Sequence, residues 1–476
     1  MLFSSFLTLL VFSTFTNPTV NKTDSDNKMS HSSMIGHSML LNRLGMLVLS
    51  FMLMLFMNSM NMMSLKPGFT LFNNWFNLTS YNLPLIMLMI LLIMGLLFYN
   101  TNTTSKNNDL LSPYLMLLIL ANSMGLLLFP LVNDLLALYI MIELQSYSLY
   151  LLTGLHNRSY NASRASLLYF LMGGVASAMI LLATYFIYSL TGTTNLSDLS
   201  MFNSLSSNNN TISYFDMLLM ALFFKMGLAP LHRWSIAVYN YAPTYITAYI
   251  SMVAKMSISS WMFTNVMFFN YHIFIIFFYL SLFMGSYKPL YQINIKTMLA
   301  YSGLLNFGYM MLSIMTYDIS FYIYMMQYTL THLMLFLSIL AASQYMSKPM
   351  SMWSPLMYMH QLKLPNLTLA MCMILALFSL IGIPPLPGFY AKFYMLMSAL
   401  EDNYMLESLI LIVCSVIATY YYANIIKVLM TSRTIKEVQG YINYSLAYVM
   451  ATTTMLLMSF FIFLPFISEG LYLITI

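Results

Sequence analysis

Four ionisable side chains lie in the middle of long apolar stretches of the sequence: Glu143, Lys225, Lys255 and Lys392. A charge at the centre of a membrane helix costs about 2.5–3.5 kcal/mol on insertion scales unless it pairs or meets water. Buried lysine and glutamate can exchange protons, because burial and nearby charges change their affinity for a proton. The four residues therefore indicate a path for protons or cations. The alternative is a set of buried ion pairs that only lock helices together.

Two of these lysines lie beside sequences that interrupt a helix. Lys225 is followed by Gly227 and Pro230, and Lys392 is preceded by the segment IPPLPGF. Proline inside a helix removes a hydrogen bond and clashes with the preceding turn. Lipid tolerates this only where protein or a water cavity satisfies the freed backbone groups. We therefore predict two broken helices with a buried lysine beside each break; ordinary proline kinks would explain the prolines but not the lysines.

Two histidines are candidates for extending the polar path. His232 follows Lys225 by seven residues, so an unbroken helix would carry both on one face. His332 lies in an apolar stretch with Gln327 and Thr331 nearby. Histidine exchanges protons near physiological pH, which suits a relay. The alternative for each is a hydrogen-bonded packing residue.

The composition around these residues is that of a membrane protein. Of 476 residues, 60 % are hydrophobic and 7 % are charged, whereas soluble domains carry about 25 % charged residues. Soluble enzymes and nucleic-acid-binding proteins are thereby excluded. Lipid admits only helices and closed barrels, and the apolar stretches are too long and continuous for barrel strands.

We therefore predict an all-α polytopic membrane protein with about fourteen transmembrane helices. The expected spans are 1–16, 39–58, 83–100, 111–128, 132–153, 164–190, 214–240, 243–266, 271–288, 294–315, 319–344, 366–399, 404–430 and 442–468. The sizeable polar stretches between them are 17–38, 59–82, 191–213 and 345–365.

The predicted breaks fall in spans 7 and 12, which cross the membrane in opposite directions because they are five spans apart. Broken helices at corresponding positions of two halves are typical of inverted repeats. We divide the chain into an N-terminal three-helix segment (1–109), a first five-helix repeat (110–266, helices 4–8), a second, inverted repeat (267–430, helices 9–13) and a C-terminal helix 14 (431–476).

Basic residues predict the orientation in the membrane. With an even number of spans, Lys66 alone falls on one side and the other side collects Lys22, Lys28, Arg43, Lys106, Arg158, Arg164, Arg233, Lys288, Lys296, Lys348, Lys363, Lys427, Arg433 and Lys436. Inner loops collect lysine and arginine, so both termini are predicted on the outer side. The first 16 residues are apolar and carry no basic residue, unlike a transit or signal peptide, which predicts an organelle-encoded or directly inserted protein.

Sequence motifs for cofactors were not found. The sequence contains no phosphate-binding loop, no dinucleotide fingerprint after a strand and no histidine pair spaced for haem or zinc. We therefore expect that this chain binds no cofactor or metal and has no redox catalytic site of its own.

Three sequence segments resemble blocks of one family, the antiporter-like subunits of respiratory complex I, the NADH:ubiquinone oxidoreductase. They are KMGLAPLHRWSIAVYNYAPT (225–244), IKTMLAYSGLLNFGYMML (295–312) and LFSLIGIPPLPGFYAKF (377–393). With Glu143, the resemblance extends over about residues 110–430.

The resemblance implies a role for each candidate residue of the predicted path. Glu143 would pair with Lys225, Lys255 would connect Lys225 to Lys392, and Lys392 would be the gate toward the opposite half-channel. His232 would correspond to the histidine that the family carries on helix 7, and His332 to the family's relay histidine.

The resemblance also implies the function and its setting. The chain would translocate protons across the mitochondrial inner membrane, coupled to electron transfer from NADH to ubiquinone in other subunits, with basic loops in the matrix and both termini toward the intermembrane space. Those other subunits would hold FMN, iron–sulfur clusters and ubiquinone. Expected partners are membrane-arm subunits, including neighbouring antiporter-like subunits and a lateral helix from one of them, and membrane lipids, but no nucleic acid. The alternatives are an Mrp-type Na⁺/H⁺ antiporter subunit and a structural spacer without its own proton path.

Overall fold

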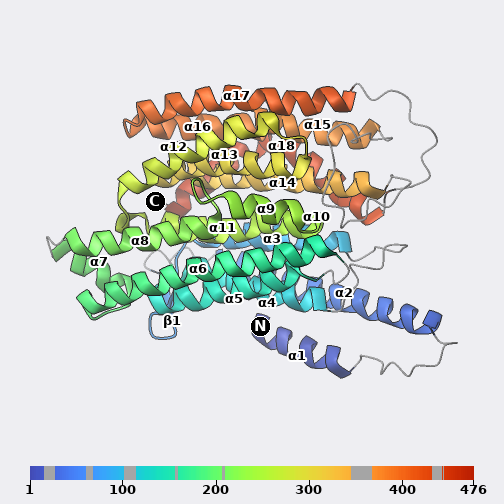
Figure 1. The fold of residues 1–476 in the computed structure, drawn as a ribbon, viewed down its shortest axis with the longest axis horizontal. Helices are drawn as coiled ribbons and strands as arrows, with labels where there is room; N and C mark the ends of the chain where they lie inside the picture. Colours follow the sequence, from blue (N-terminus) through green and yellow to red (C-terminus); the bar gives the residue numbers. More distant parts are fainter. Residues whose placement is uncertain are drawn as a thin grey trace.

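The computed structural model describes residues 1–15, 27–60, 68–100, 114–155, 159–205, 209–344, 367–430, 442 and 444–475. Within these ranges the chain forms helices and one small β-hairpin (Figure 1). The first part contains α1 (Leu2–Phe15), α2 (Asn27–Met60), β1 (Phe69–Leu71), β2 (Phe76–Leu78), α3 (Leu83–Asn100), α4 (Tyr114–Leu128), η2 (Phe129–Leu131), α5 (Leu135–Thr153), α6 (Tyr160–Thr191) and α7 (Leu196–Leu205).

The rest of the chain is helical where it is described. It contains α8 (Asn209–Met226), α9 (Arg233–Tyr241), α10 (Thr244–Tyr249), η3 (Ile250–Ala254), α11 (Lys255–Thr264), η4 (Val266–Phe268), α12 (Tyr271–Tyr287), η5 (Lys288–Tyr291), α13 (Ile295–Thr316), α14 (Ser320–Gln344), α15 (Leu367–Ile381), α16 (Pro387–Glu401), α17 (Met405–Met430) and α18 (Tyr444–Thr475).

The chain is a helical membrane protein. Among the described residues, nine helices are long and apolar enough to cross a membrane, and three shorter apolar helices accompany them. The expected spans 214–240, 243–266 and 366–399 are each divided, into α8 and α9, into α10, η3 and α11, and into α15 and α16. The divisions of 214–240 and 366–399 lie beside Lys225 and Lys392, where glycine and proline predicted breaks, whereas no break was predicted within 243–266.

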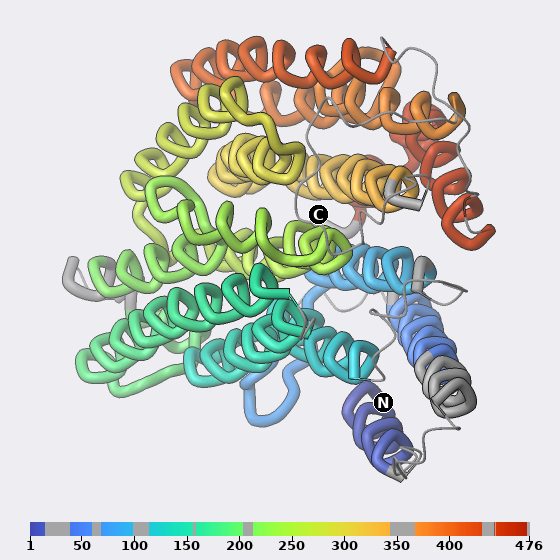
Figure 2. The backbone as a smooth tube through the Cα atoms, turned by 45° about the vertical axis from the view of Figure 1, so that its right-hand side comes forward, coloured from blue at the N-terminus to red at the C-terminus, as the bar shows by residue number. Residues whose placement is uncertain are grey.

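The central helices carry the polar residues of interest. Nearly all of α13 and most of α14 is buried, whereas α6, α17 and α18 are mostly exposed on the outside of the bundle. Figure 2 shows α4, α5 and α6 on one side of this centre and α15, α16 and α17 on the other. Helices α12 and α13, α4 and α5, and α6 and α8 pack along one another.

Glycines end two of the divided helices. Gly227 follows α8 with φ +68°, and Gly382 follows α15 with φ +96°. This left-handed conformation suits glycine and commonly terminates a helix. After each glycine a proline-containing segment leads to the next helix, and α16 begins at Pro387, where a missing amide hydrogen costs nothing.

Three stretches expected to be polar loops contain regular structure. The hairpin of β1 and β2 lies within 59–82, and α7 lies within 191–213; α2 also begins inside the expected loop 17–38. Asn133 joins the hairpin to the bundle, because its backbone amide donates to Trp75 and its side-chain amide donates to Asn74 and Asn195. Asn133 therefore contacts both loops that meet at this end of α5.

Eight of the basic residues that predict the orientation lie outside the described ranges. The basic residues that lie outside the described ranges are Lys22, Lys66, Lys106, Arg158, Lys348, Lys363, Arg433 and Lys436. Among the others, Lys296 was counted with the charges of the inner side, at the start of the expected span 294–315. It lies at the start of α13 and is 4 % exposed, so it is an internal charge.

Candidate functional site

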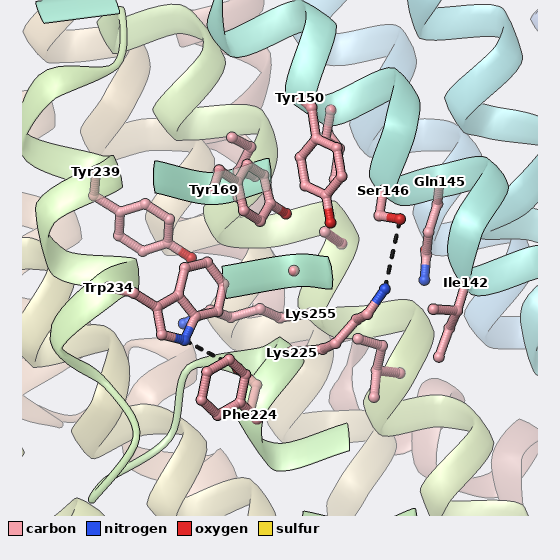
Figure 3. A pocket seen from close by; sticks show the side chains of 15 residues that line it. Ile142, Gln145, Ser146, Tyr150, Tyr169, Phe224, Lys225, Trp234, Tyr239 and Lys255 are labelled. Atoms are coloured by element: carbon pink, nitrogen blue, oxygen red, sulfur yellow. Dashed lines mark hydrogen bonds between the residues drawn. The ribbon is translucent and has the colours of Figure 1, made fainter. Parts of the chain in front are cut away.

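The structure brings Glu143 and Lys225 together. Lys225 Nζ on α8 lies 3.1 Å from Glu143 Oε1 on α5, and the two side chains are 7 % and 12 % exposed. A buried charge is tolerated when it is paired and hydrogen-bonded. Ser146, one turn after Glu143, lies at the edge of hydrogen-bond distance from the same ammonium, at 3.5 Å (Figure 3). The predicted path would therefore begin at this ion pair.

A side chain caps the C-terminal end of the interrupted helix beside Lys225. Trp234 Nε1 on α9 donates to the backbone oxygen of Phe224, at 3.1 Å, so one carbonyl at the end of α8 is satisfied (Figure 3). The Trp234 ring stacks on Tyr169 of α6. These contacts fix the last turn of α8 and therefore the position of Lys225.

A first cavity of about 30 Å³ lies between Lys225 and Lys255. Polar atoms of Gln145, Ser146 and Tyr239 contribute to its lining, which Figure 3 shows around the two lysines. A water molecule needs roughly 10–15 Å³ of such volume and polar partners. The cavity therefore has room for about two water molecules between the lysines.

Lys255 is held by aromatic rings. It is 5 % exposed, and its Nζ lies 4.8 Å from the ring centre of Phe307 and 5.2 Å from that of Tyr239. Within the ranges that the structure describes, no carboxylate pairs with it. An ammonium over ring faces gains cation–π attraction but no fixed counter-charge.

A second cavity, of about 10 Å³, lies on the other side of Lys255. Lys296 and His332 line it together with Lys255. His332 Nδ1 lies 3.0 Å from the Tyr328 carbonyl, which can only accept, so Nδ1 carries the hydrogen. His332 Nε2 is buried without a partner among the described residues, so it is free to accept a proton or bind water. The predicted relay histidine thus lies beside Lys255.

Sequence reasoning missed Lys296 as a site residue. Its Nζ donates to the backbone oxygen of Ala242 at 2.9 Å, between α9 and α10. It was counted among the basic residues that predict the orientation, because it lies near the end of the expected span 294–315. The available signal was the long apolar run that follows Lys296 directly.

His232 does not join this arrangement. Neither cavity is lined by it, and its Nδ1 lies 3.2 Å from the Pro230 carbonyl. The expectation of a shared face with Lys225 is wrong, because α8 ends at Met226 and His232 precedes a separate helix, α9.

Lys392 lies at the other broken helix. Its Nζ donates to the backbone oxygens of Leu380 and Ile381, at 3.0 and 3.1 Å, and lies 5.6 Å from the ring centre of Tyr309. These carbonyls end α15 and carry the partial negative charge of a helix C-terminus. Lys392 is therefore stabilised by backbone carbonyls where Lys225 is stabilised by a carboxylate.

Buried polar groups lie between the second cavity and Lys392. Tyr324 donates to Asn306 Oδ1 at 3.0 Å, while Asn306 Nδ2 and the Tyr309 hydroxyl have no partner among the described residues. Such atoms are normally satisfied by protein or ordered water. They lie on α13 near Phe307, which contacts Lys255, and Tyr309 itself contacts Lys392.

No metal centre is evident in the described part of the chain, where no three His, Cys, Asp or Glu side chains gather closely enough to hold an ion. The expectation that the chain binds no cofactor stays a prediction.

Comparison with known proteins places this arrangement in a family. The sequence profile described as "NADH:quinone oxidoreductase/Mrp antiporter, TM" matches residues 132–420. The chain is 63 % identical to NADH-ubiquinone oxidoreductase chain 2 of the yeast Debaryomyces hansenii over 476 residues, the full length of both chains.

Solved structures show the same fold at lower identity. A chain of respiratory complex I from Thermus thermophilus matches with a TM-score of 0.74 at 22 % identity, covering 89 % of this chain and 92 % of that one. A chain of the Mrp complex from Dietzia matches with a TM-score of 0.79 at 16 % identity, covering 94 % of both. The profile match spans more than half of the sequence, so the chain belongs to the NADH:quinone oxidoreductase/Mrp antiporter family of membrane proteins, as the three sequence blocks had suggested.

Proposed function

We propose that the chain is a proton-translocating membrane-arm subunit of respiratory complex I, and that it is the fungal subunit 2. The full-length relative from Debaryomyces hansenii, at 63 % identity, carries the name NADH-ubiquinone oxidoreductase chain 2. Electron transfer from NADH to ubiquinone takes place in other subunits, which hold FMN and iron–sulfur clusters. The chain is then part of an enzyme and contributes its proton translocation.

We place it in the mitochondrial inner membrane with fourteen crossings. Two come from the short apolar helices α1 and α3, nine from the long apolar helices, and three from the divided helices α8–α9, α10–α11 and α15–α16. The divided helices belong to two inverted repeats, residues 110–266 and 267–430. Basic loops then face the matrix and both termini face the intermembrane space.

The mechanism begins at the ion pair. A charge change in the neighbouring subunit, transmitted along the polar interior, separates Glu143 from Lys225. Without the carboxylate the ammonium form of Lys225 is disfavoured, and its proton moves through the first cavity to Lys255. From there it passes the second cavity and reaches Lys392, which releases it to one side while Lys225 is reprotonated from the other.

The observation that carries the proposal is the buried contact of 3.1 Å between Glu143 and Lys225, next to a cavity shared with Lys255. We expect Glu143→Ala and Lys225→Ala to reduce NADH-driven proton pumping sharply in complexes that still assemble. The matched control is Lys288→Ala, because Lys288 is exposed in η5. Wild-type ratios of protons pumped to electrons transferred in both assembled variants would contradict the proposal.

The partners follow from the same proposal. They are other membrane-arm subunits, including neighbouring antiporter-like subunits and a lateral helix from one of them, and membrane lipids. Copurification in mild detergent tests this directly, since a complex with flavin and iron–sulfur subunits is expected.

An Mrp-type Na⁺/H⁺ antiporter subunit is the second candidate, because the family includes both kinds of protein and the Dietzia chain has the same fold. Sodium-driven proton exchange in vesicles without NADH would favour it. A purely structural spacer is the third, and it requires that neutralising Lys255 and Lys392 together leaves pumping intact.

A further inference from the structure

The helix that carries Lys255 changes its winding just before that residue. α10 passes into η3, which is π-helical over Ile250–Ala254, and α11 begins at Lys255 itself. A π-helical turn bonds each amide five residues back, so it accommodates one residue more than an α-turn, and such turns are frequent at functional sites.

Both flanking helices are fixed to other elements. Before η3, the Tyr249 hydroxyl donates to Asn122 Oδ1 of α4 at 2.7 Å. After it, Trp261 Nε1 donates to the backbone oxygen of Val132 at 3.1 Å. All these side chains are buried. The extra residue is therefore confined between two anchors.

One side chain from another helix binds the π-helical turn itself. The Tyr328 hydroxyl on α14 donates to the backbone oxygen of Ser251 at 3.1 Å, and Tyr328 is 1 % exposed. The Tyr328 backbone oxygen is also the partner of His332 Nδ1. Tyr328 thus connects the turn before Lys255 to the histidine of the second cavity.

We propose that Tyr328 is a positioning residue for Lys255. The Tyr328 hydroxyl holds the extra residue of the π-helical turn before Lys255. When this hydrogen bond breaks, the extra residue moves past Lys255, and the Lys255 ammonium turns from one cavity toward the other. This inference rests on the proposed proton path. Lys255 lines both cavities, so a rotation about the helix axis changes which of them its ammonium faces.

The size of the movement follows from helix geometry. When the extra residue moves from η3 to the far side of Lys255, the intervening residues shift by one α-helical position, about 100° of rotation and 1.5 Å along the axis. The anchors at Tyr249 and Trp261 stay in place. Besides the bond from Tyr328 to Ser251, the movement must break the hydrogen bond of 3.1 Å from Ser257 to Gln145 Oε1.

That contact links the movement to the ion pair. Gln145 is on α5, two residues after Glu143, and lines the first cavity beside Lys225. A shift of α5 when the pair separates therefore acts on Ser257 and on the register of the Lys255 helix. The rotation of Lys255 is coupled to the opening of the pair without any contact between Lys255 and Glu143.

Deletion of Ala254 tests the inference in the assembled complex. Ala254 is the smallest residue of η3, and its removal leaves a continuous α-helix with both anchors in register but no extra residue to move. We expect assembly at wild-type levels and proton pumping reduced to the level of Lys255→Ala. The control is deletion of Ala183, which is also buried, inside α6. This deletion turns the rest of α6 out of register and should prevent assembly.

A second variant leaves the chain length unchanged. Tyr328→Phe removes only the hydroxyl that holds Ser251, and we expect pumping between wild type and Lys255→Ala, with the π-helical turn displaced in a cryo-EM map. The matched control is Tyr322→Phe on the same helix, because the Tyr322 hydroxyl donates to another backbone oxygen, that of Tyr81. It should pump like wild type.

Measuring Lys225→Ala in the same experiment distinguishes a failure of this inference from a failure of the proposed function. If the Ala254 deletion assembles and pumps like wild type while Lys225→Ala does not pump, the inference is wrong and the proton path stands. If neither change reduces pumping, the proposed function fails. If the Ala254 deletion does not assemble, the turn holds no movable extra residue and the inference is likewise wrong.

Discussion

Lys296 and Ala242 are 54 positions apart in the sequence, yet the ammonium of Lys296 lies 2.9 Å from the backbone oxygen of Ala242. Pro243 follows Ala242, so this carbonyl lies at a junction between two helices, α9 and α10. Lys296 therefore holds the junction through which the chain passes from the Lys225 side to the Lys255 helix.

The first prediction concerns this contact. Lys296→Met leaves the Ala242 carbonyl without a donor, and an unsatisfied buried group costs about 1–3 kcal/mol. The variant also removes a charge from the second cavity. We expect a lower melting temperature of the purified complex and reduced pumping. Lys288→Met, at an exposed position, serves as the control, and an equal effect of both variants would contradict the assignment.

Two substitutions at Lys392 separate structure from proton exchange. Arginine can still donate to the carbonyls of Leu380 and Ile381 but cannot lose its proton in a protein, whereas methionine can do neither. We expect Lys392→Arg to assemble normally and not to pump, and Lys392→Met to assemble poorly. Assembly is measured by native gels and pumping in vesicles. An arginine variant that pumps would show that Lys392 acts only as a fixed charge.

The Glu143–Lys225 pair predicts a non-additive effect on stability. Removing one partner of a buried pair leaves an uncompensated charge and costs about 3–5 kcal/mol, whereas replacing both is often close to neutral. Glu143→Gln with Lys225→Met should therefore be more stable to heat than either single variant, although none of the three should pump. Additive losses in thermal inactivation would argue against a direct interaction.

Tyr309→Phe tests the polar connection toward Lys392. The phenylalanine ring keeps the aromatic contact with Lys392 but removes a buried hydroxyl that has no protein partner in the described part of the chain. We expect slower pumping with unchanged stability, because a bound water loses one of its partners. Tyr279→Phe, whose hydroxyl binds Glu407 away from the path, is the control. Identical pumping in the two variants would remove Tyr309 from the path.

The sequence predicted those features that depend on local signals. The family resemblance and the helical membrane fold are confirmed, and the structure brings Glu143 and Lys225 into contact. The role of the path stays a prediction. The sequence alone shows charged residues within apolar stretches, and it shows glycine and proline beside Lys225 and Lys392.

The features that the sequence did not reveal depend on distant contacts. The π-helical turn before Lys255 lies between anchors formed with residues 127 and 129 positions away. The burial of Lys296 depends on a carbonyl in another helix. His232 was misplaced although a break beside Lys225 was predicted, because α8 already ends at Met226 and His232 lies beyond that break, directly before α9.

The Asn133 contacts have a consequence for the order in which the protein forms. This residue binds the hairpin, which is synthesised before it, and Asn195, which is synthesised 62 positions later. The connection cannot be complete until the ribosome has passed Asn195 and α6 has entered the membrane. A nascent chain stopped before that point would hold the hairpin without its final neighbour, so the hairpin and the facing ends of α5 and α6 reach their final arrangement together.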